Sequence, residues 1–149
     1  MAARLFVLNG PNLNMLGLRE PGLYGRATLE HVEAECRRTA TEVGFDLFFG
    51  QTSAEHQLVD WVHDAVRQEA VVVINPAAYS FTSVALLDAL RMLERPVVEV
   101  HITNIHARDA VYRNSLISSV ADAVIAGAGT YGYELAIRAI ARLAEPAPI

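Results

Sequence analysis

The sequence predicts an α/β fold in which helices cover both faces of a parallel sheet. Strand-like and helix-like segments alternate along the chain, which is typical of parallel strands joined by helical crossovers. The segment "AVVVIN" at 70–75 is a continuous β-branched run of the kind buried on both faces of such a sheet. With 149 residues, 52% of them hydrophobic, the chain is long enough for one domain with a substantial core. We expect a single domain over 1–149, with a proline-containing tail from about 144.

The first elements follow from apolar spacing and from glycine and proline stops. The run "RLFVLN" at 4–9 ends at Asn-Gly-Pro, which predicts a strand with a sharp stop. Apolar residues at helical spacing from Leu29 onward predict a helix that ends at Gly44. The apolar run "FDLFFG" at 45–50 follows directly as the second strand.

A capping-box pattern predicts the start of the second helix, because Glu55 follows Thr52 by three residues. The strand at 70–75 comes next. The same criteria give a helix over about 83–93, strands at 96–102 and 121–127, and a helix over about 131–143. Together these elements predict a flavodoxin-like doubly wound sheet of five strands, in the order 2-1-3-4-5. Only the segments 10–27 and 102–120 show no clear element, and loops of that length in a compact domain are usually functional.

Composition excludes several classes of protein. The net charge is −5, so there is no basic surface of the kind that binds nucleic acid. No run approaches the ~18 apolar residues of a membrane span, and the N-terminal apolar run is too short for a signal peptide. A single cysteine, Cys36, allows no internal disulfide. We therefore expect a cytoplasmic protein that binds neither nucleic acid nor membrane.

Polar residues gather where this fold binds ligands, outside the carboxyl ends of the strands. The first strand ends at Asn9 with Asn12 just beyond, and the third ends at Asn75. In "VVEVHI", strand alternation places Glu99 and His101 on the same side. A carboxylate two residues before a histidine can orient an imidazole that acts as an acid or a base.

The loop "GLREPGLYG" at 17–25 adds a guanidinium and a phenol, Arg19 and Tyr24, to the same edge. A nearby cation favours the phenolate, and a tyrosinate can remove a proton next to a carbonyl group. A histidine across the pocket could then protonate a leaving hydroxyl, which suggests elimination of water from a hydroxy ketone. The alternative is a solvated arginine beside a half-buried tyrosine. The glycines and proline would let the loop close over a substrate as a lid.

Other ligands of this fold fit the edge poorly. A phosphorylated receiver domain needs carboxylates where this chain has the amides of Asn9, Asn12 and Asn75. A flavin mononucleotide site favours hydroxyl groups after the first strand, and "NGPNLNMLG" has no serine or threonine. We interpret "GAGTYG" at 127–132 as a tight strand-to-helix turn rather than a dinucleotide site, because it follows the last strand. No histidine spacing matches a standard metal site, so we expect neither metal nor cofactor.

Three blocks of the sequence resemble, in order, the type II 3-dehydroquinate dehydratases: "VLNGPNLNMLGLREPGLYG", "INPAAYSFTSVALLDAL" and "VEVHITNIHARD". The resemblance covers essentially the whole chain. It implies a lyase that converts 3-dehydroquinate to 3-dehydroshikimate by anti elimination through an enolate, in the shikimate pathway of aromatic biosynthesis or in quinate catabolism. It also implies a small-molecule substrate, no cofactor, and a homo-oligomer that is a dodecamer built from trimers.

The resemblance assigns chemical roles to the polar residues of the edge. Tyr24 resembles the general base, and Arg19 resembles the cation that stabilises its phenolate and the developing charge. Asn12 resembles the residue that holds a water against the enolate oxygen. His101 resembles the acid that protonates the departing hydroxyl, with Glu99 orienting it.

Four further positions resemble residues that bind the substrate. Asn75, Ile102 and Thr103 correspond to residues that bind its hydroxyl and carboxylate groups, with Thr103 in place of a more usual serine. Asp88 resembles a residue that reaches into the site of a neighbouring subunit.

Two positions depart from the pattern of the family. Phe81 stands where a histidine is usual, and Tyr112 where an arginine is usual, with Arg113 one step later. Both usual residues serve the C4 and C5 hydroxyl end of the substrate. Two alternatives therefore stay open: the same elimination on an analogue modified at C4 or C5, such as an amino-dehydroquinate, or a non-catalytic relative that binds a cyclic polyol acid.

Overall fold

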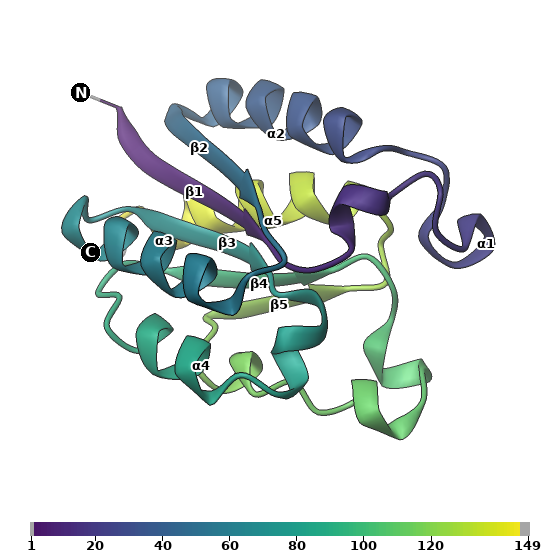
Figure 1. Ribbon diagram of the computed structural model, residues 1–149. Coiled ribbons are helices and arrows are strands. Elements are labelled where there is room, and N and C mark those ends of the chain that lie inside the picture. Colours follow the sequence, from purple (N-terminus) through teal and green to yellow (C-terminus); the bar gives the residue numbers. More distant parts are fainter. Residues whose placement is uncertain (1, 147–149) are drawn as a thin grey trace.

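The computed structural model describes residues 2–146, in which five parallel strands form one twisted sheet (Figure 1). The strand order is β2-β1-β3-β4-β5, which confirms the predicted order. It is the order of a flavodoxin-like fold. The strands are β1 (Ala3–Asn9), β2 (Phe45–Gln51), β3 (Val71–Asn75), β4 (Val97–His101) and β5 (Ala123–Ala126).

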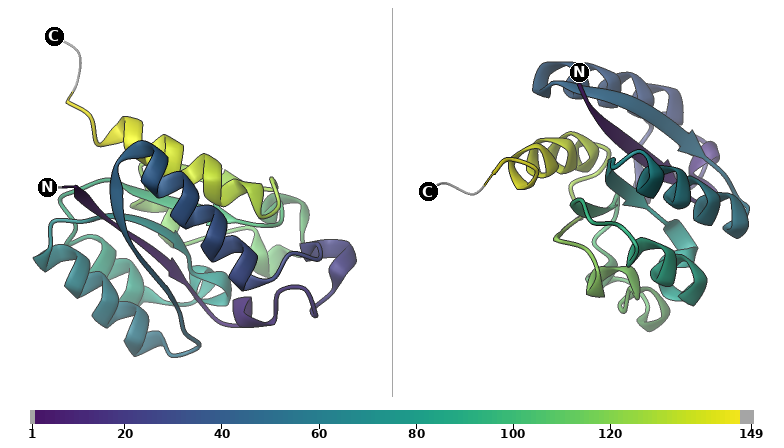
Figure 2. Two further views of the ribbon diagram at one scale, coloured as in Figure 1. Left: turned by 90° about the horizontal axis from the view of Figure 1, so that it is seen from above. Right: turned by 90° about the vertical axis from the view of Figure 1, so that its left-hand side faces the viewer.

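Helices cover both faces of the sheet, as predicted (Figure 2). On one face lie α2 (Leu29–Val43) and α5 (Tyr131–Leu143), and on the other lie α3 (Glu55–Arg67) and α4 (Val84–Leu90). Alternate residues of β1 enter the two cores, since Leu5 belongs to the α2/α5 core and Phe6 to the α3/α4 core. Of the three inner strands, β3 and β4 are buried throughout. This double burial explains the continuous apolar run at 70–75.

The predicted capping box before α3 is wrong. The helix begins at Glu55 after Ala54, and no side chain caps it. The Thr52 hydroxyl accepts a hydrogen bond from the Ala54 N–H (3.0 Å), two residues on, and is therefore used in a local turn. A capping box is present instead at the start of α2, between Thr28 and His31.

The two unassigned segments contain short elements. A single-turn helix, α1 (Pro21–Tyr24), lies in the first, and the second holds three short 3₁₀ helices. The helix predicted over 83–93 ends at Leu90. Residues 147–149 of the predicted tail lie outside the described residues. Between residues 2 and 146, no helix is both long and apolar enough to cross a membrane.

Candidate active site

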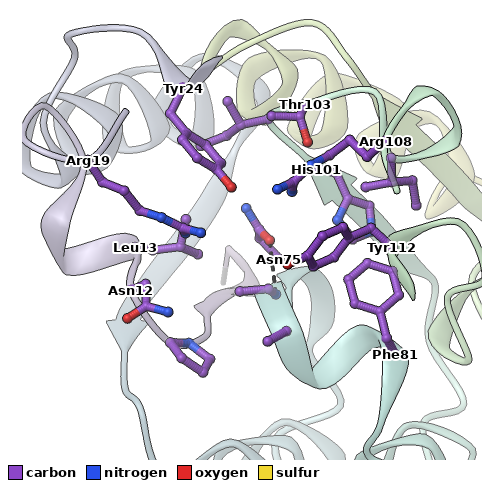
Figure 3. A pocket seen from close by; sticks show the side chains of 15 residues that line it. Asn12, Leu13, Arg19, Tyr24, Asn75, Phe81, His101, Thr103, Arg108 and Tyr112 are labelled. Carbon is purple, nitrogen blue, oxygen red and sulfur yellow. Dashed lines mark hydrogen bonds between the residues drawn. The ribbon is translucent and has the colours of Figure 1, made fainter. Parts of the chain in front are cut away.

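A cavity of about 180 Å³ opens at the carboxyl ends of β1, β3 and β4 (Figure 3). This is the position at which doubly wound sheets bind their ligands, next to the point where the strand order reverses. Its wall is formed by the loops that follow these strands and by the segment before α2. The lining residues are Pro11, Asn12, Leu13, Arg19, Tyr24, Asn75, Ala77, Ala78, Phe81, His101, Ile102, Thr103, Ile105, Arg108 and Tyr112.

The ends of β1 and β3 form a rigid floor. Asn9 pairs in register with Asn75, and the Gly10 N–H donates to the Asn75 carbonyl oxygen (2.9 Å). A Cβ atom at Gly10 would lie 2.3 Å from the carbonyl oxygen of Pro76, so only glycine allows this close approach. Asn12 then takes a left-handed conformation, with φ of 71°, as the chain leaves the floor.

A buried tyrosine fixes the amide of Asn75. The Asn75 Nδ2 donates to the Tyr133 hydroxyl (2.9 Å), and the Asn75 Oδ1 accepts from the Ala77 N–H (3.2 Å). The Tyr133 hydroxyl in turn donates to Asn9 Oδ1 (2.7 Å), and burial raises the pKa of Tyr133, so it stays protonated. The Asn75 amide therefore has one orientation and retains one N–H and one lone pair for a ligand.

The phenol of Tyr24 points into the cavity from α1 (Figure 3). The guanidinium carbon of Arg19 lies 4.6 Å from the centroid of its ring, and that of Arg108 lies 5.8 Å away. Arg19 and Tyr24 are thus brought together as predicted. The second cation, Arg108, comes from the segment that follows β4.

Strand alternation brings His101 and Glu99 together as predicted, with 4% and 0% of their surfaces exposed. His101 Nε2 hydrogen-bonds Glu99 Oε2, which leaves Nδ1 as the other ring nitrogen. The Ser115 hydroxyl donates to Oε2 (2.7 Å) and the Ser118 hydroxyl to Oε1 (2.6 Å). Burial alone would raise the pKa of the Glu99 carboxyl, but hydrogen bonds from His101, Ser118 and Ser115 outweigh it and hold that pKa below its ordinary value.

An aromatic wall closes one side of the cavity. The Phe81 ring stacks on the His101 imidazole, with ring centroids 6.3 Å apart, and meets the Tyr112 ring edge-on at 5.6 Å. The guanidinium carbon of Arg108 lies 4.1 Å from the centroid of Tyr112. This side of the cavity is therefore apolar and π-rich, with a cation held over one ring.

The turn "GAGTYG" supports the end of β4, as a tight strand-to-helix turn. Gly127 and Gly129 both have positive φ, and their N–H groups donate to the carbonyl oxygens of His101 (3.3 Å) and Ile102 (3.0 Å). Thr103 follows, buried, with its hydroxyl on the cavity side (Figure 3). The segment from His101 to Thr103 is therefore held on its outer side by backbone hydrogen bonds.

Most of the predicted site residues line this one cavity, and Glu99 lies directly behind His101. Two lie elsewhere. Asp88 is exposed on α4, with an oxygen 3.6 Å from a nitrogen of Arg91. Arg113 is exposed and its Nε donates to the Arg108 carbonyl oxygen, so it does not face the cavity.

Three residues at or behind the site were missed from the sequence. Arg108 lines the cavity between Tyr24 and Tyr112, and Ser115 and Ser118 hold Glu99. All three lie in 102–120, where neither strand nor helix periodicity indicates a direction for a side chain. The described residues include no cluster of three or more His, Cys, Asp or Glu side chains placed to hold a metal ion.

Comparisons with known proteins agree on one family. Residues 3–141 match the family model described as Dehydroquinase class II. The chain is 51% identical over 137 residues to the 3-dehydroquinate dehydratase 2 of Agrobacterium fabrum, covering 92% of this chain and 93% of that protein. It is 52% identical over 145 residues to the 3-dehydroquinate dehydratase of Brucella canis, covering 97% and 92%.

Solved structures give the same result. The type II dehydroquinase from Propionibacterium acnes superposes with a TM-score of 0.91 at 42% identity, covering 95% of this chain and 98% of that one. A 3-dehydroquinate dehydratase-like protein from Bifidobacterium longum gives a TM-score of 0.71 at 32% identity, covering 95% and 97%.

Proposed function

The chain belongs to the class II dehydroquinase family, and on that premise we propose that it dehydrates 3-dehydroquinate to 3-dehydroshikimate, with Tyr24 as base and His101 as acid. The observation that carries the proposal is one cavity faced by a phenol between two guanidinium groups and by an imidazole backed by a buried carboxylate. A base and an acid on separate supports suit an elimination in which a proton and a hydroxyl leave from different atoms.

The first step removes a proton from C2 of the substrate, next to the C3 carbonyl. Tyr24 takes this proton as a phenolate, and the C–H electron pair becomes the double bond of an enolate. The guanidinium groups of Arg19 and Arg108 lie beside the Tyr24 ring, where they can stabilise the negative charge that develops on the substrate. Asn12 holds a water against the enolate oxygen, where preorganised donors stabilise the charge that develops.

The second step expels the C1 hydroxyl. The enolate electrons form the C1–C2 double bond, the C1–O bond breaks, and His101 donates a proton so that water leaves. Glu99 orients the imidazole for that transfer. The proton taken by Tyr24 and the proton given by His101 balance over the cycle once they exchange with solvent. No metal or organic cofactor takes part in either step.

Residues at the ends of β3 and β4 bind the substrate. We assign the hydroxyl and carboxylate groups to Asn75, Ile102 and Thr103, because Asn75 keeps free amide capacity and Thr103 presents a hydroxyl on the cavity side. The loop 17–25 acts as a lid, as its glycines and proline suggest.

We extend the proposal to assembly and location. The protein is a cytoplasmic dodecamer of trimers, and Asp88, which is exposed on α4, reaches the site of a neighbouring subunit. The net charge of the chain is −5, which does not favour a nucleic-acid partner. Size-exclusion chromatography with light scattering tests the assembly, and a monomeric mass would contradict the role of Asp88.

The aromatic wall favours a second candidate within the same chemistry. Phe81 and Tyr112 pack against each other beside His101, so this side of the cavity offers few hydrogen bonds to a hydroxylated ring edge. Elimination on an analogue altered at C4 or C5, such as an amino-dehydroquinate, fits that wall. Arg113 does not supply the missing guanidinium, whereas Arg108 lies over Tyr112.

One assay separates these readings. Purified protein is mixed with 3-dehydroquinate, and the conjugated enone absorbance of the product is followed. Turnover at a rate typical of enzymes supports the first proposal, and faster turnover of a C4- or C5-modified analogue supports the second. Binding of these compounds without turnover of any would identify a non-catalytic relative instead.

A further inference from the structure

Two serine hydroxyl groups donate hydrogen bonds to the oxygens of the buried Glu99 carboxylate. Ser115 donates to Oε2 at 2.7 Å, and Ser118, in the short 3₁₀ helix η5 (Ile117–Ser119), donates to Oε1 at 2.6 Å. Neither serine lines the cavity, and both are partly buried. They contact the chemistry only through Glu99.

An ionised carboxylate with no exposed surface needs donors to replace lost water. Along the sheet the register neighbours of Glu99 are Ile74 on β3 and Val124 on β5, which are apolar. An ionised carboxylate is an acceptor only, so each serine hydroxyl must be the donor. With His101, the two serines supply the hydrogen bonds that outweigh burial and keep the pKa of Glu99 low.

The importance of the Glu99 charge for His101 depends on the other charged side chains of the cavity. The titratable and charged side chains that share the cavity with it are the guanidinium groups of Arg19 and Arg108 and the phenols of Tyr24 and Tyr112. None of the lining residues is a carboxylate. Glu99, which hydrogen-bonds His101 from behind the cavity, is therefore the carboxylate in contact with the imidazole.

We propose that Ser115 and Ser118 are positioning residues that keep Glu99 ionised and so hold His101 with Nε2 toward Glu99 and Nδ1 as the proton donor. The role of the serines in holding Glu99 is supported by the geometry of the buried carboxylate. The role of His101 as proton donor rests on the proposed function. Removal of either hydroxyl should make the Glu99 carboxylate hold the proton shared with His101 more tightly, so that His101 becomes a weaker acid, while substrate contacts stay intact.

The same short helix offers a matched control. Ser119 is exposed, and its hydroxyl donates to the Leu116 carbonyl oxygen (2.8 Å) instead of to Glu99. Ser119→Ala therefore removes a hydroxyl next to Ser118 without touching the carboxylate.

The test measures the pH dependence of kcat and KM for 3-dehydroquinate in Ser115→Ala, Ser118→Ala and Ser119→Ala. The first two should lower kcat roughly tenfold with KM unchanged, and should move the alkaline limb of kcat to higher pH, because a carboxylate that has lost a donor holds the proton shared with His101 more tightly. Ser115→Thr and Ser118→Thr keep the hydroxyl and should restore the wild-type profile. If an alanine variant does not fold, the cysteine variant replaces it, because a thiol fills the space but donates weakly.

A second measurement does not depend on turnover. Nitrogen-15 NMR of histidine-labelled protein follows the pH at which His101 loses its ring proton, with its signal assigned by its absence in His101→Asn. That pH should rise in Ser115→Ala and Ser118→Ala and stay constant in Ser119→Ala. Equal titrations in all three variants would overturn the proposal. Failure of the wild-type protein to convert 3-dehydroquinate would instead overturn the proposed function, and the NMR result would still decide the role of the serines.

Discussion

His101 and Tyr24 face one cavity from two kinds of support. His101 ends a central strand whose residues are all buried, and its imidazole rests on a carboxylate that three side chains bind. Tyr24 ends a single-turn helix with no buried residue, inside a loop that includes Gly17 and Gly25 at positive φ. The sheet therefore holds one reactive group rigidly, and a loop carries the other.

The difference suggests a division of labour between the two supports. A buried, hydrogen-bonded imidazole keeps its orientation whether or not substrate is bound, because the sheet around it cannot rearrange cheaply. A loop with few core contacts opens at low cost, so substrate can enter before the phenol closes on it. Substitutions on the loop should therefore change kinetics with little effect on stability, whereas substitutions under β4 should change both.

Tyr24→Phe breaks the loop side of the comparison most completely. Removal of the general base should lower kcat by about 10²–10⁴-fold. The melting temperature should stay near that of the wild type, because the Tyr24 ring is only partly buried on a loop. Steady-state kinetics and thermal denaturation on the same samples measure both effects. Full activity in Tyr24→Phe would remove this residue from the chemistry.

Glu99→Gln breaks the strand side. A glutamine amide has one acceptor oxygen in place of two, and its NH₂ group would face a donor. At least one of the donors His101, Ser115 and Ser118 would therefore lose its buried acceptor. We expect kcat to fall by about 10–100-fold and the free energy of unfolding to fall by about 1–3 kcal/mol. Loss of activity with unchanged stability would show that the strand side is no more tightly coupled to the core than the loop.

The stability change should also depend on pH. The pKa of Glu99 is lower in the folded protein than its ordinary value, so its ionised form stabilises the fold above about pH 4, and this stabilisation is lost as pH falls through the folded pKa. The difference in unfolding free energy between wild type and Glu99→Gln should therefore be largest near neutral pH and shrink in acid. Urea denaturation at several pH values measures it. A difference that grows in acid would contradict an ionised Glu99.

Arg19→Leu tests the electrostatics of the loop. Without the guanidinium 4.6 Å from the Tyr24 ring, the negative charge that develops in the transition state loses a nearby cation, and kcat should fall about tenfold. Arg113→Leu is the matched control, since Arg113 is exposed and turned away from the cavity. An equal effect of both substitutions would point to net charge rather than to contact with Tyr24.

The sequence predicts the residues on the sheet better than the residues on the loops. The strands and long helices were predictable because burial imposes periodicity, as in the run at 70–75 and the spacing from Leu29 to Val43. Alternation along β4 likewise predicted that Glu99 and His101 share one side. Where the sheet determines the position of a residue, local pattern is enough.

The loops were not predictable in this way. Arg108 approaches Tyr24 only through the tertiary fold, and nothing near either residue in the sequence encodes the contact. The hydroxyl of Thr52 could cap a helix or close a local turn, and its spacing to Glu55 does not distinguish the two. Short 3₁₀ turns such as the one holding Ser118 carry no long period, so the direction of their side chains needed the structure.

Gly25→Ala tests the same comparison through the backbone of the loop. Gly25 ends α1 with φ of 80° and ψ of −174°, a region that essentially only glycine adopts. A Cβ atom there meets no other atom within 4 Å, so the cost of alanine is conformational and about 1–3 kcal/mol. That cost falls on the loop conformation that presents Tyr24, which should lower kcat/KM by about 5- to 150-fold while the melting temperature changes little. Gly22→Ala is the control, because Gly22 also has open space around it but lacks a positive φ. A large drop in melting temperature for Gly25→Ala would mean that the loop is part of the cooperative core, and the separate supports inferred for acid and base would not hold.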